Sequence, residues 1–117
     1  KNSSSPIIVS EIEDDIDYIF DAADIIGGFI KRKCNGGDRI DKIDSAINII
    51  NELQSAYVNQ TIEFMIHNNS LGNYTMNLDT FDSNNKYGNL SVSKDEIRKF
   101  MIRIIDLNNP TIELYGL

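Results

Sequence analysis

A chain of 117 residues can bury a hydrophobic core as one domain, and 41% hydrophobic with 25% charged residues is typical of a globular protein, which excludes a disordered chain. No stretch approaches about 18 consecutive apolar residues, so we expect neither a transmembrane helix nor a membrane partner. Eleven basic residues against 18 acidic ones give a net charge of −7, which argues against a nucleic-acid partner.

The acidic residues are unevenly distributed along the chain. Residues 11–24 contain seven acids and no base, whereas the other residues contain 11 acids and 11 bases, which sum to zero. The whole net charge therefore lies in one segment, and this asymmetry bears on partners and solubility rather than on the fold. The seven acids are Glu11, Glu13, Asp14, Asp15, Asp17, Asp21 and Asp24.

The first predicted elements are two helices. We interpret residues 1–10 as a polar tail and lead-in, and residues 11–117 as a single globular domain. Between residues 11 and 33 apolar side chains recur in steps of three and four, which predicts an amphipathic helix. Ser10 and Glu13 match a capping box at its start. A second helix beginning near Asp38 keeps this spacing, and the short glycine-rich link predicts an antiparallel helical hairpin.

The second half of the chain mixes strand and helix patterns. Residues 61–67 and 74–78 alternate apolar and polar side chains, which favours a hairpin of strands, although residues 61–67 would also continue the preceding helix. A short strand over 90–92, a helix over 94–107 and a final strand over 111–117 follow. Together the elements predict an α+β fold: an antiparallel helical hairpin plus a third helix, packed with a small, mostly antiparallel sheet and without an internal repeat.

The acidic segment is the strongest functional signal. On the predicted first helix, five acids share one face opposite the apolar stripe, and pairs of acids four residues apart repel each other. This face is either a solvated surface or a docking surface for a basic protein, while metal binding would need carboxylates from a second helix. Tyr18 belongs to an apolar strip beside the acids that either packs inward or anchors a partner. The strip consists of Tyr18, Ala22, Ile25 and Phe29.

The other motifs give little indication of a metal-binding or catalytic site. Residues 82–96 resemble a calcium-binding EF-hand loop, but position 12 of that loop would be Ser93 and a ligand position would hold Lys86. His67 has no nucleophile or zinc ligand near it in the sequence. Cys34 cannot form an internal disulfide, and this lone thiol favours a reducing compartment, so we expect a cytoplasmic protein. We predict no catalytic residue, no metal site and no cofactor.

The sequence therefore predicts a non-enzymatic acidic domain that docks a basic protein partner. Its most concrete form is an inhibitor or immunity protein of a basic toxin or nuclease. The alternative is a secretion or assembly chaperone that acts as a dimer through exposed apolar strips; the sequence does not fix the oligomeric state. The predicted partner-binding residues are Glu13, Asp14, Asp17, Asp21, Asp24 and Tyr18.

Overall fold

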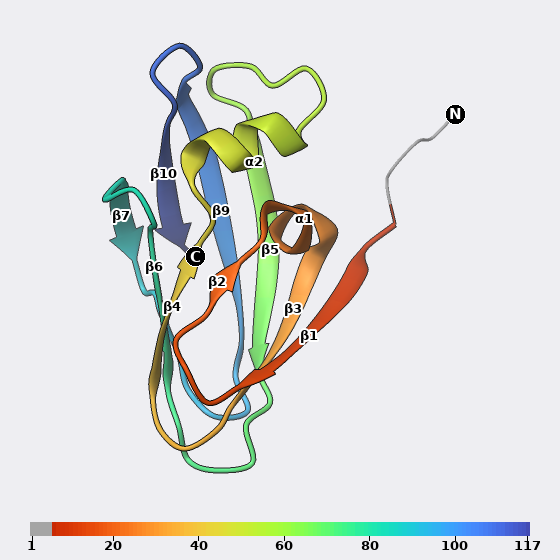
Figure 1. Cartoon of the computed structure of the whole chain (residues 1–117), viewed down its shortest axis with the longest axis vertical. Helices are drawn as coiled ribbons and strands as arrows, with labels where there is room; N and C mark the ends of the chain where they lie inside the picture. The colour runs from red at the N-terminus through yellow and green to blue at the C-terminus, as the bar shows by residue number, and fades with distance from the viewer. Residues whose placement is uncertain (1–5) are drawn as a thin grey trace.

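The computed structural model describes residues 6–117, which form two β-sheets and two short helices (Figure 1). The prediction for residues 1–5 lies outside the described residues. Strands take up 49% of the described chain and helices 12%. The predicted α+β fold with a helical hairpin and a third helix is therefore wrong, because the protein is mostly β.

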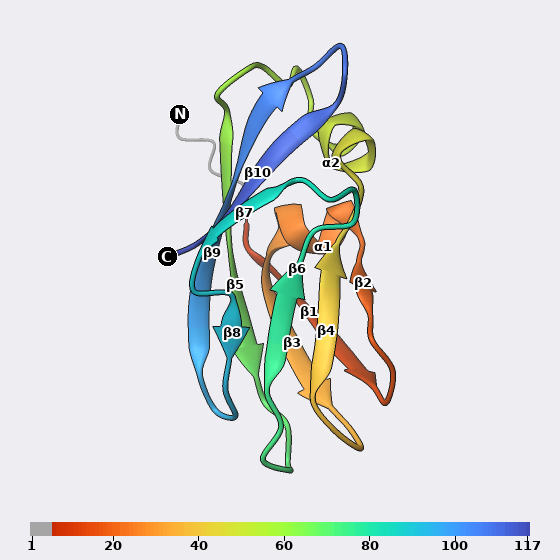
Figure 2. The same cartoon turned by 90° about the vertical axis from the view of Figure 1, so that its left-hand side faces the viewer.

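The two sheets contain six and four strands. The larger sheet, sheet A, has six strands in the order β1 (Ile8–Asp14), β3 (Gly28–Cys34), β5 (Thr61–Asn68), β9 (Ile97–Asp106), β10 (Thr111–Gly116) and β7 (Asn85–Gly88). The smaller sheet, sheet B, has four strands in the order β2 (Ile19–Phe20), β4 (Arg39–Ile43), β6 (Met76–Asp79) and β8 (Ser91–Val92). In Figure 2 the two sheets form separate layers, and α1 and α2 lie above the upper end of sheet B, beside the upper part of sheet A.

The first part of the fold is a repeated unit that the sequence analysis did not detect. In each unit, which we call a rung, the chain forms a strand of sheet A, then a strand of sheet B, then a helix. The first rung consists of β1, β2 and α1 (Ala22–Gly27), and the second of β3, β4 and α2 (Ala46–Glu52). Strands β5 and β6 continue the pattern without a helix. Equivalent strands pair in parallel from rung to rung, and α1 contacts α2.

The hydrophobic core lies between the two sheets and beneath the helices. Along β5 and β9 alternate side chains point inward, and the rings of Phe64 and Phe100 stack there with centroids 5.6 Å apart. The helices add Ala22, Ile25, Ala46 and Ile49. Sheet B contributes Phe20, Ile43, Met76, Leu78 and Val92. Burial of this apolar surface is the main stabilising contribution to the fold.

The helix predicted over residues 11–33 is replaced by β1, β2, α1 and β3. Isoleucine spacing in this stretch fits a helical period, but the β-branched side chains favour extended backbone, and in β3 every second side chain is buried. Gly28 ends α1 in the left-handed region with φ of 101°, which a residue with a Cβ rarely adopts. The predicted helix from Asp38 is reduced to the seven residues of α2, after β4.

The third predicted helix, over residues 94–107, is also a strand, β9. The amide of Ser93 donates to Glu96 Oε1 at 2.8 Å, as in a capping box, but this contact closes a turn that leads into β9. The strands predicted near 61–67, 74–78, 90–92 and 111–117 are present as β5, β6, β8 and β10. However, β5 and β6 do not form the predicted hairpin, because they belong to different sheets.

Candidate functional site

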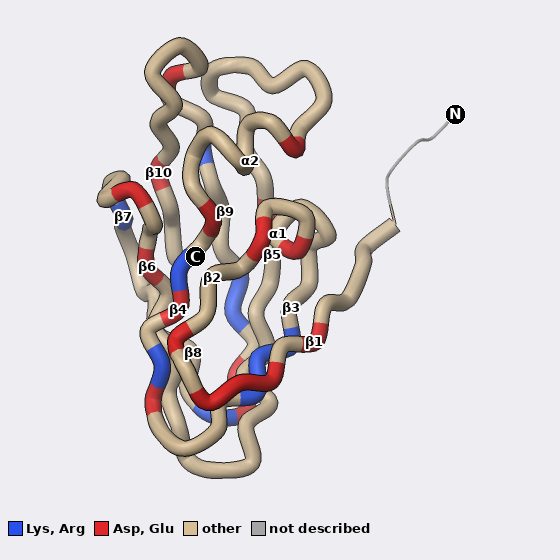
Figure 3. The backbone as a smooth tube through the Cα atoms, viewed as in Figure 1, with Lys and Arg blue, Asp and Glu red and all other residues tan. Residues whose placement is uncertain are grey.

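The acidic segment lies on the first rung and not on one helix. Glu13 and Asp14 are in β1, Asp17 is in the loop before β2, Asp21 is the N-cap residue of α1, and Asp24 is in its first turn. β1 is an edge strand of sheet A and β2 an edge strand of sheet B, so the segment forms one outer end of the fold. In Figure 3 its acidic residues follow the loop between β1 and β2 and continue into α1. We call residues 8–27 the acidic rung.

Most of these carboxylates have no basic partner. Within residues 6–117, the only ion pair of the acidic rung joins Glu13 to Lys33, with 3.7 Å between Oε1 and Nζ. Both side chains are partly exposed, so the pair contributes about 1 kcal/mol or less. Asp17 Oδ1 accepts a hydrogen bond from the amide of Ile40 at 3.0 Å, and Asp24 Oδ1 accepts one from Ser10 Oγ at 2.8 Å. These neutral donors hold the carboxylates in place without cancelling their charge.

Tyr18 lies at the centre of the acidic rung. Its ring packs on Phe20, with centroids 5.6 Å apart, and the Arg32 guanidinium carbon lies over the Tyr18 ring, 5.9 Å from its centroid. Burial raises the pKa of Tyr18, and the carboxylates of Asp21, Asp24 and Asp14 raise it further. Carboxylates from different parts of the acidic rung therefore disfavour ionisation of the same phenol.

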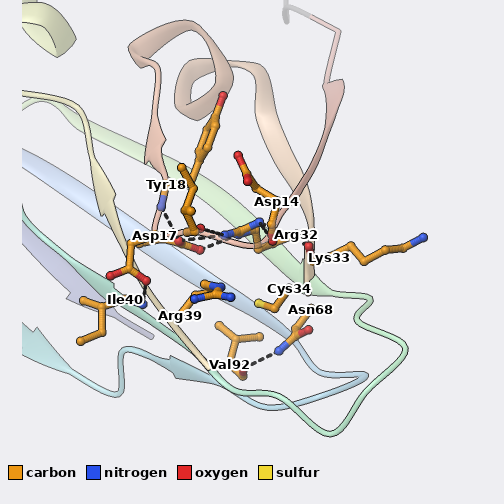
Figure 4. A network of polar contacts seen from close by, with 12 residues as sticks. Asp14, Asp17, Tyr18, Arg32, Lys33, Cys34, Arg39, Ile40, Asn68 and Val92 are labelled. Carbon is orange, nitrogen blue, oxygen red and sulfur yellow. Dashed lines mark hydrogen bonds and ion pairs between the residues drawn. The ribbon is translucent and has the colours of Figure 1, made fainter. Parts of the chain in front are cut away.

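A buried ion pair lies beneath Tyr18 (Figure 4). Arg32 Nε lies 2.7 Å from Asp41 Oδ2, a second guanidinium nitrogen lies 3.2 Å from Asp41 Oδ1, and both side chains are fully buried. Burial alone would lower the pKa of Arg32, but the hydrogen bond and charge of Asp41 outweigh this effect and raise it. Arg32 therefore stays charged in the interior, and its charge is balanced locally.

This ion pair holds the loop of the acidic rung from two sides. Arg32 donates to the carbonyl of Ile16 at 2.8 Å and to that of Asp14 at 3.5 Å. Asp41 Oδ1 accepts the amide hydrogen of Tyr18 at 2.8 Å. A buried ion pair contributes little net stability, because desolvation offsets its attraction, but its fixed geometry orients the groups around it. Two second-rung residues thus fix the backbone that presents the acids.

Sequence reasoning missed Arg32 and Asp41. Arg32 fell near the C-terminal end of the helix predicted over residues 11–33, where no buried partner was expected for it. In the structure it follows Ile30 and precedes Cys34 on the inward face of β3. If residues 28–34 are interpreted as a strand, Arg32 falls between two buried apolar positions. An arginine there needs a buried acid as its partner.

A second buried polar network borders this ion pair. Asn68 Nδ2 donates to the carbonyls of Tyr74 and Val92, each at 2.9 Å, and its Oδ1 accepts from Ser70 Oγ at 2.6 Å. Ser70 Oγ in turn accepts from the amide of Cys34 at 2.7 Å. The network joins β3 and β5 of sheet A to the chain around β6 and β8 of sheet B. Burial raises the pKa of the Cys34 thiol, which opposes thiolate formation.

The apolar strip predicted beside the acids is not an exposed strip. Ala22 and Ile25 are buried in the core, while Tyr18 and Phe29 are partly covered. Three isoleucines near Asp17 are exposed instead, with Ile16 at 60%, Ile40 at 53% and Ile19 at 44%. Two of them, Ile19 and Ile40, line a shallow hollow of about 460 Å³ together with Asp17, Tyr18, Lys42 and Asp79.

The remaining sequence motifs form no site in the described part of the chain. Residues 82–96 fold as β7, β8 and the turns around them, and they form no calcium loop. Within residues 6–117, no three His, Cys, Asp or Glu side chains are arranged to hold a metal ion, and neither helix could span a membrane. Comparison with protein-family models, curated proteins and solved structures found no match.

Proposed function

We propose that this protein is a non-enzymatic binding domain whose acidic rung docks a basic protein. The observation that carries the proposal is that seven acids share this rung, while only Glu13 has an ion-pair partner among the described residues. In its most concrete form, the protein inhibits a basic toxin or nuclease by covering it, as an immunity protein does.

Two features of the rung suit it to this role. Opposite potentials accelerate encounter with a basic partner and disfavour other partners. The loop that follows Asp14 and carries Asp17 is fixed by Arg32 and Asp41, so its ordering adds little entropic cost on binding. The exposed isoleucines near Asp17 supply apolar surface beside the charge, as a well-packed interface needs.

The proposal is tested by a pull-down from the native source, with the captured proteins identified by mass spectrometry. We expect a protein with a basic surface, bound at low ionic strength and released as salt rises, because exposed charges are screened within about 8 Å at physiological salt. Capture of only acidic or neutral proteins, or capture that salt leaves unchanged, would contradict the proposal.

The alternative, a chaperone that acts through exposed apolar strips, has less support. The strip on which it depended is largely covered, since Ala22 and Ile25 belong to the core. Sedimentation equilibrium distinguishes the two functions. The chaperone requires a dimer that persists at high salt, whereas the acidic domain has no need of one.

A further inference from the structure

Among the described residues, no strand pairs with the outer edge of the seven-residue strand β1. It pairs in parallel with β3 from Ile8 to Asp14 and is the terminal strand of sheet A. The amide of Asn35 donates to the carbonyl of Asp14 at 3.1 Å, which shows that the backbone groups of Asp14 face β3. Because these groups alternate along a strand, the N–H and C=O groups of Val9, Glu11 and Glu13 face outward.

Residues along this outer edge are exposed in the described part of the chain. The residues whose backbone groups face outward, Val9, Glu11 and Glu13, are all exposed, and Val9 is 54% exposed. An open row of peptide groups is a template on which another chain can add as a strand. Its side chains alternate between two faces, with Glu11 and Glu13 on the outer face of sheet A, and Ser10 and Ile12 on the inner side.

Charge decides which chain can add there. Two copies of β1 that paired with each other would bring Glu11 and Glu13 of one copy close to those of the other, and like charges opposite each other are destabilising. On the same face Lys33 of β3 already pairs with Glu13, with 3.7 Å between Nζ and Oε1, whereas Glu11 has no ion-pair partner among residues 6–117. Glu11 is therefore the carboxylate on this face of β1 whose charge is left for a basic side chain of an added strand.

We propose that the basic partner adds a strand to the outer edge of β1, as a seventh strand of sheet A. This strand alternates Lys or Arg, placed beside Glu11 and Glu13, with apolar residues placed beside Ile8 and Ile12. The inference rests on the proposed function and deepens it, because it states how the acidic rung recognises a basic chain. Backbone hydrogen bonds to Val9, Glu11 and Glu13 supply affinity, and the glutamates select the partner's charge.

The test uses a capped nine-residue peptide of alternating lysine and valine, with an alternating glutamate and valine peptide as the control. The variants Glu11→Pro and Glu11→Gln both remove the charge of Glu11, but only proline also removes the outward N–H. Neither change touches the hydrogen bonds between β1 and β3, and proline is tolerated on an edge strand. Affinity is measured by calorimetry for the wild-type protein and both variants.

We expect Glu11→Gln to weaken binding of the lysine peptide about threefold, and Glu11→Pro to weaken it by about a further tenfold, the effect of roughly one hydrogen bond. In the wild-type protein, saturating peptide should also slow amide hydrogen exchange at Val9, Glu11 and Glu13. The amides of Ser10 and Ile12, which already pair with β3, should change little. This second measurement does not depend on how the proline variant folds.

Two outcomes would overturn strand addition. If the proline and glutamine variants bind the peptide with equal affinity, the peptide binds through charge alone. The same conclusion follows if amide exchange is unchanged in the saturated complex at Val9, Glu11 and Glu13. The proposed function would survive that result, because the acidic rung would still hold a cationic chain. Failure of the proposed function gives a different result, in which the lysine and glutamate peptides bind equally weakly to the wild-type protein.

Discussion

Arg32 Nε and Asp41 Oδ2 lie 2.7 Å apart, and neither side chain reaches the solvent. Arg32 belongs to β3 of sheet A and Asp41 to β4 of sheet B, so the pair joins the two layers within the second rung. The same two side chains hold the carbonyl of Ile16 and the amide of Tyr18 in the first rung. The interior of the fold therefore fixes the shape of its acidic surface.

We predict that Arg32→Met destabilises the protein by about 3–5 kcal/mol, because Asp41 then remains as a buried charge without a partner. The carbonyl of Ile16 also loses its donor. Urea denaturation measures the loss. The double variant Arg32→Met/Asp41→Leu should recover part of this stability, since no unpaired charge remains. A double variant as unstable as the sum of the two single variants would show that the ion pair is not the unit that matters.

A second prediction concerns the ionisation of Tyr18. Its pKa is raised by burial and by nearby carboxylates, because each disfavours the phenolate anion. The double variant Asp21→Asn/Asp24→Asn should therefore lower the pKa of Tyr18, whereas Asp106→Asn should leave it unchanged. The titration is followed by ultraviolet absorbance, with Tyr18→Phe subtracted to isolate this residue. No response to the double variant would mean that these carboxylates do not influence the ionisation of Tyr18.

The direction of this shift also fixes a pH dependence of stability. The pKa of Tyr18 is higher in the folded than in the unfolded chain, so the resulting stabilisation is complete below the unfolded value of about 10. It is lost as pH rises from there through the folded value. Tyr18→Phe should remove this component, which urea denaturation at pH 8 and pH 11 would detect as a smaller loss of stability at the higher pH.

Several strands of the second half were predicted because apolar and polar side chains alternate along them, although residues 61–67 also fitted a continuation of the preceding helix. Ile62, Phe64 and Ile66 alternate with exposed residues, and β5 lies where that alternation occurs. In β9, by contrast, Phe100 and Ile102 are followed by Ile104 and Ile105, and this run fits a helical stripe as well as a strand. Where a short helix follows a short strand, as α1 follows β2, the spacing of apolar residues across both elements matches that of one long helix. Tertiary packing decides such segments.

The sequence was sufficient to predict the concentration of acidic residues at the candidate site, but not their arrangement in space. The count of acids over residues 11–24 requires no knowledge of the fold, and the acids do occupy one end of the molecule. Their arrangement around Tyr18 depends on β1 and β2 belonging to different sheets, which no local pattern specifies. The role of Arg32 depends on Asp41, nine residues later, and on burial that only the assembled rungs provide.

Asn68 is expected to be the most sensitive neutral polar residue of the interior. Its side chain bonds the carbonyls of Tyr74 and Val92 and accepts from Ser70. Asn68→Ala would leave these groups buried without partners, and we predict a loss of about 3 kcal/mol in the free energy of unfolding. Thermal and urea denaturation both measure it. A loss below about 1 kcal/mol would indicate that water replaces the amide.

Cys34 should be an inert thiol in the folded protein. It is fully buried, and burial raises its pKa, so little thiolate is present near neutral pH. We predict that a thiol-specific reagent labels Cys34 slowly in buffer and rapidly in urea, with the native rate governed by opening of the fold. Labelling as rapid in buffer as in urea would place Cys34 at the surface.

Neutralising the acidic rung should not harm the fold. In the triple variant Asp17→Asn/Asp21→Asn/Asp24→Asn, the amide oxygens can still accept from Ile40 and Ser10. The repulsion between the acids falls at the same time. We predict a free energy of unfolding within about 0.5 kcal/mol of the wild-type value, or slightly higher, by urea denaturation. A loss of more than about 2 kcal/mol would mean that these carboxylates serve the structure.

The most direct test compares this triple variant with Glu52→Gln/Asp95→Asn/Asp106→Asn, which removes three acids elsewhere. Both variants change the net charge from −7 to −4, so any difference between them reports position and not total charge. The measurement is the affinity of each for the basic protein captured from the native source. We predict that the acidic-rung variant loses about tenfold or more, equivalent to about 1.4 kcal/mol, while the matched variant stays close to wild type. Equal losses, or no loss in either, would contradict the account.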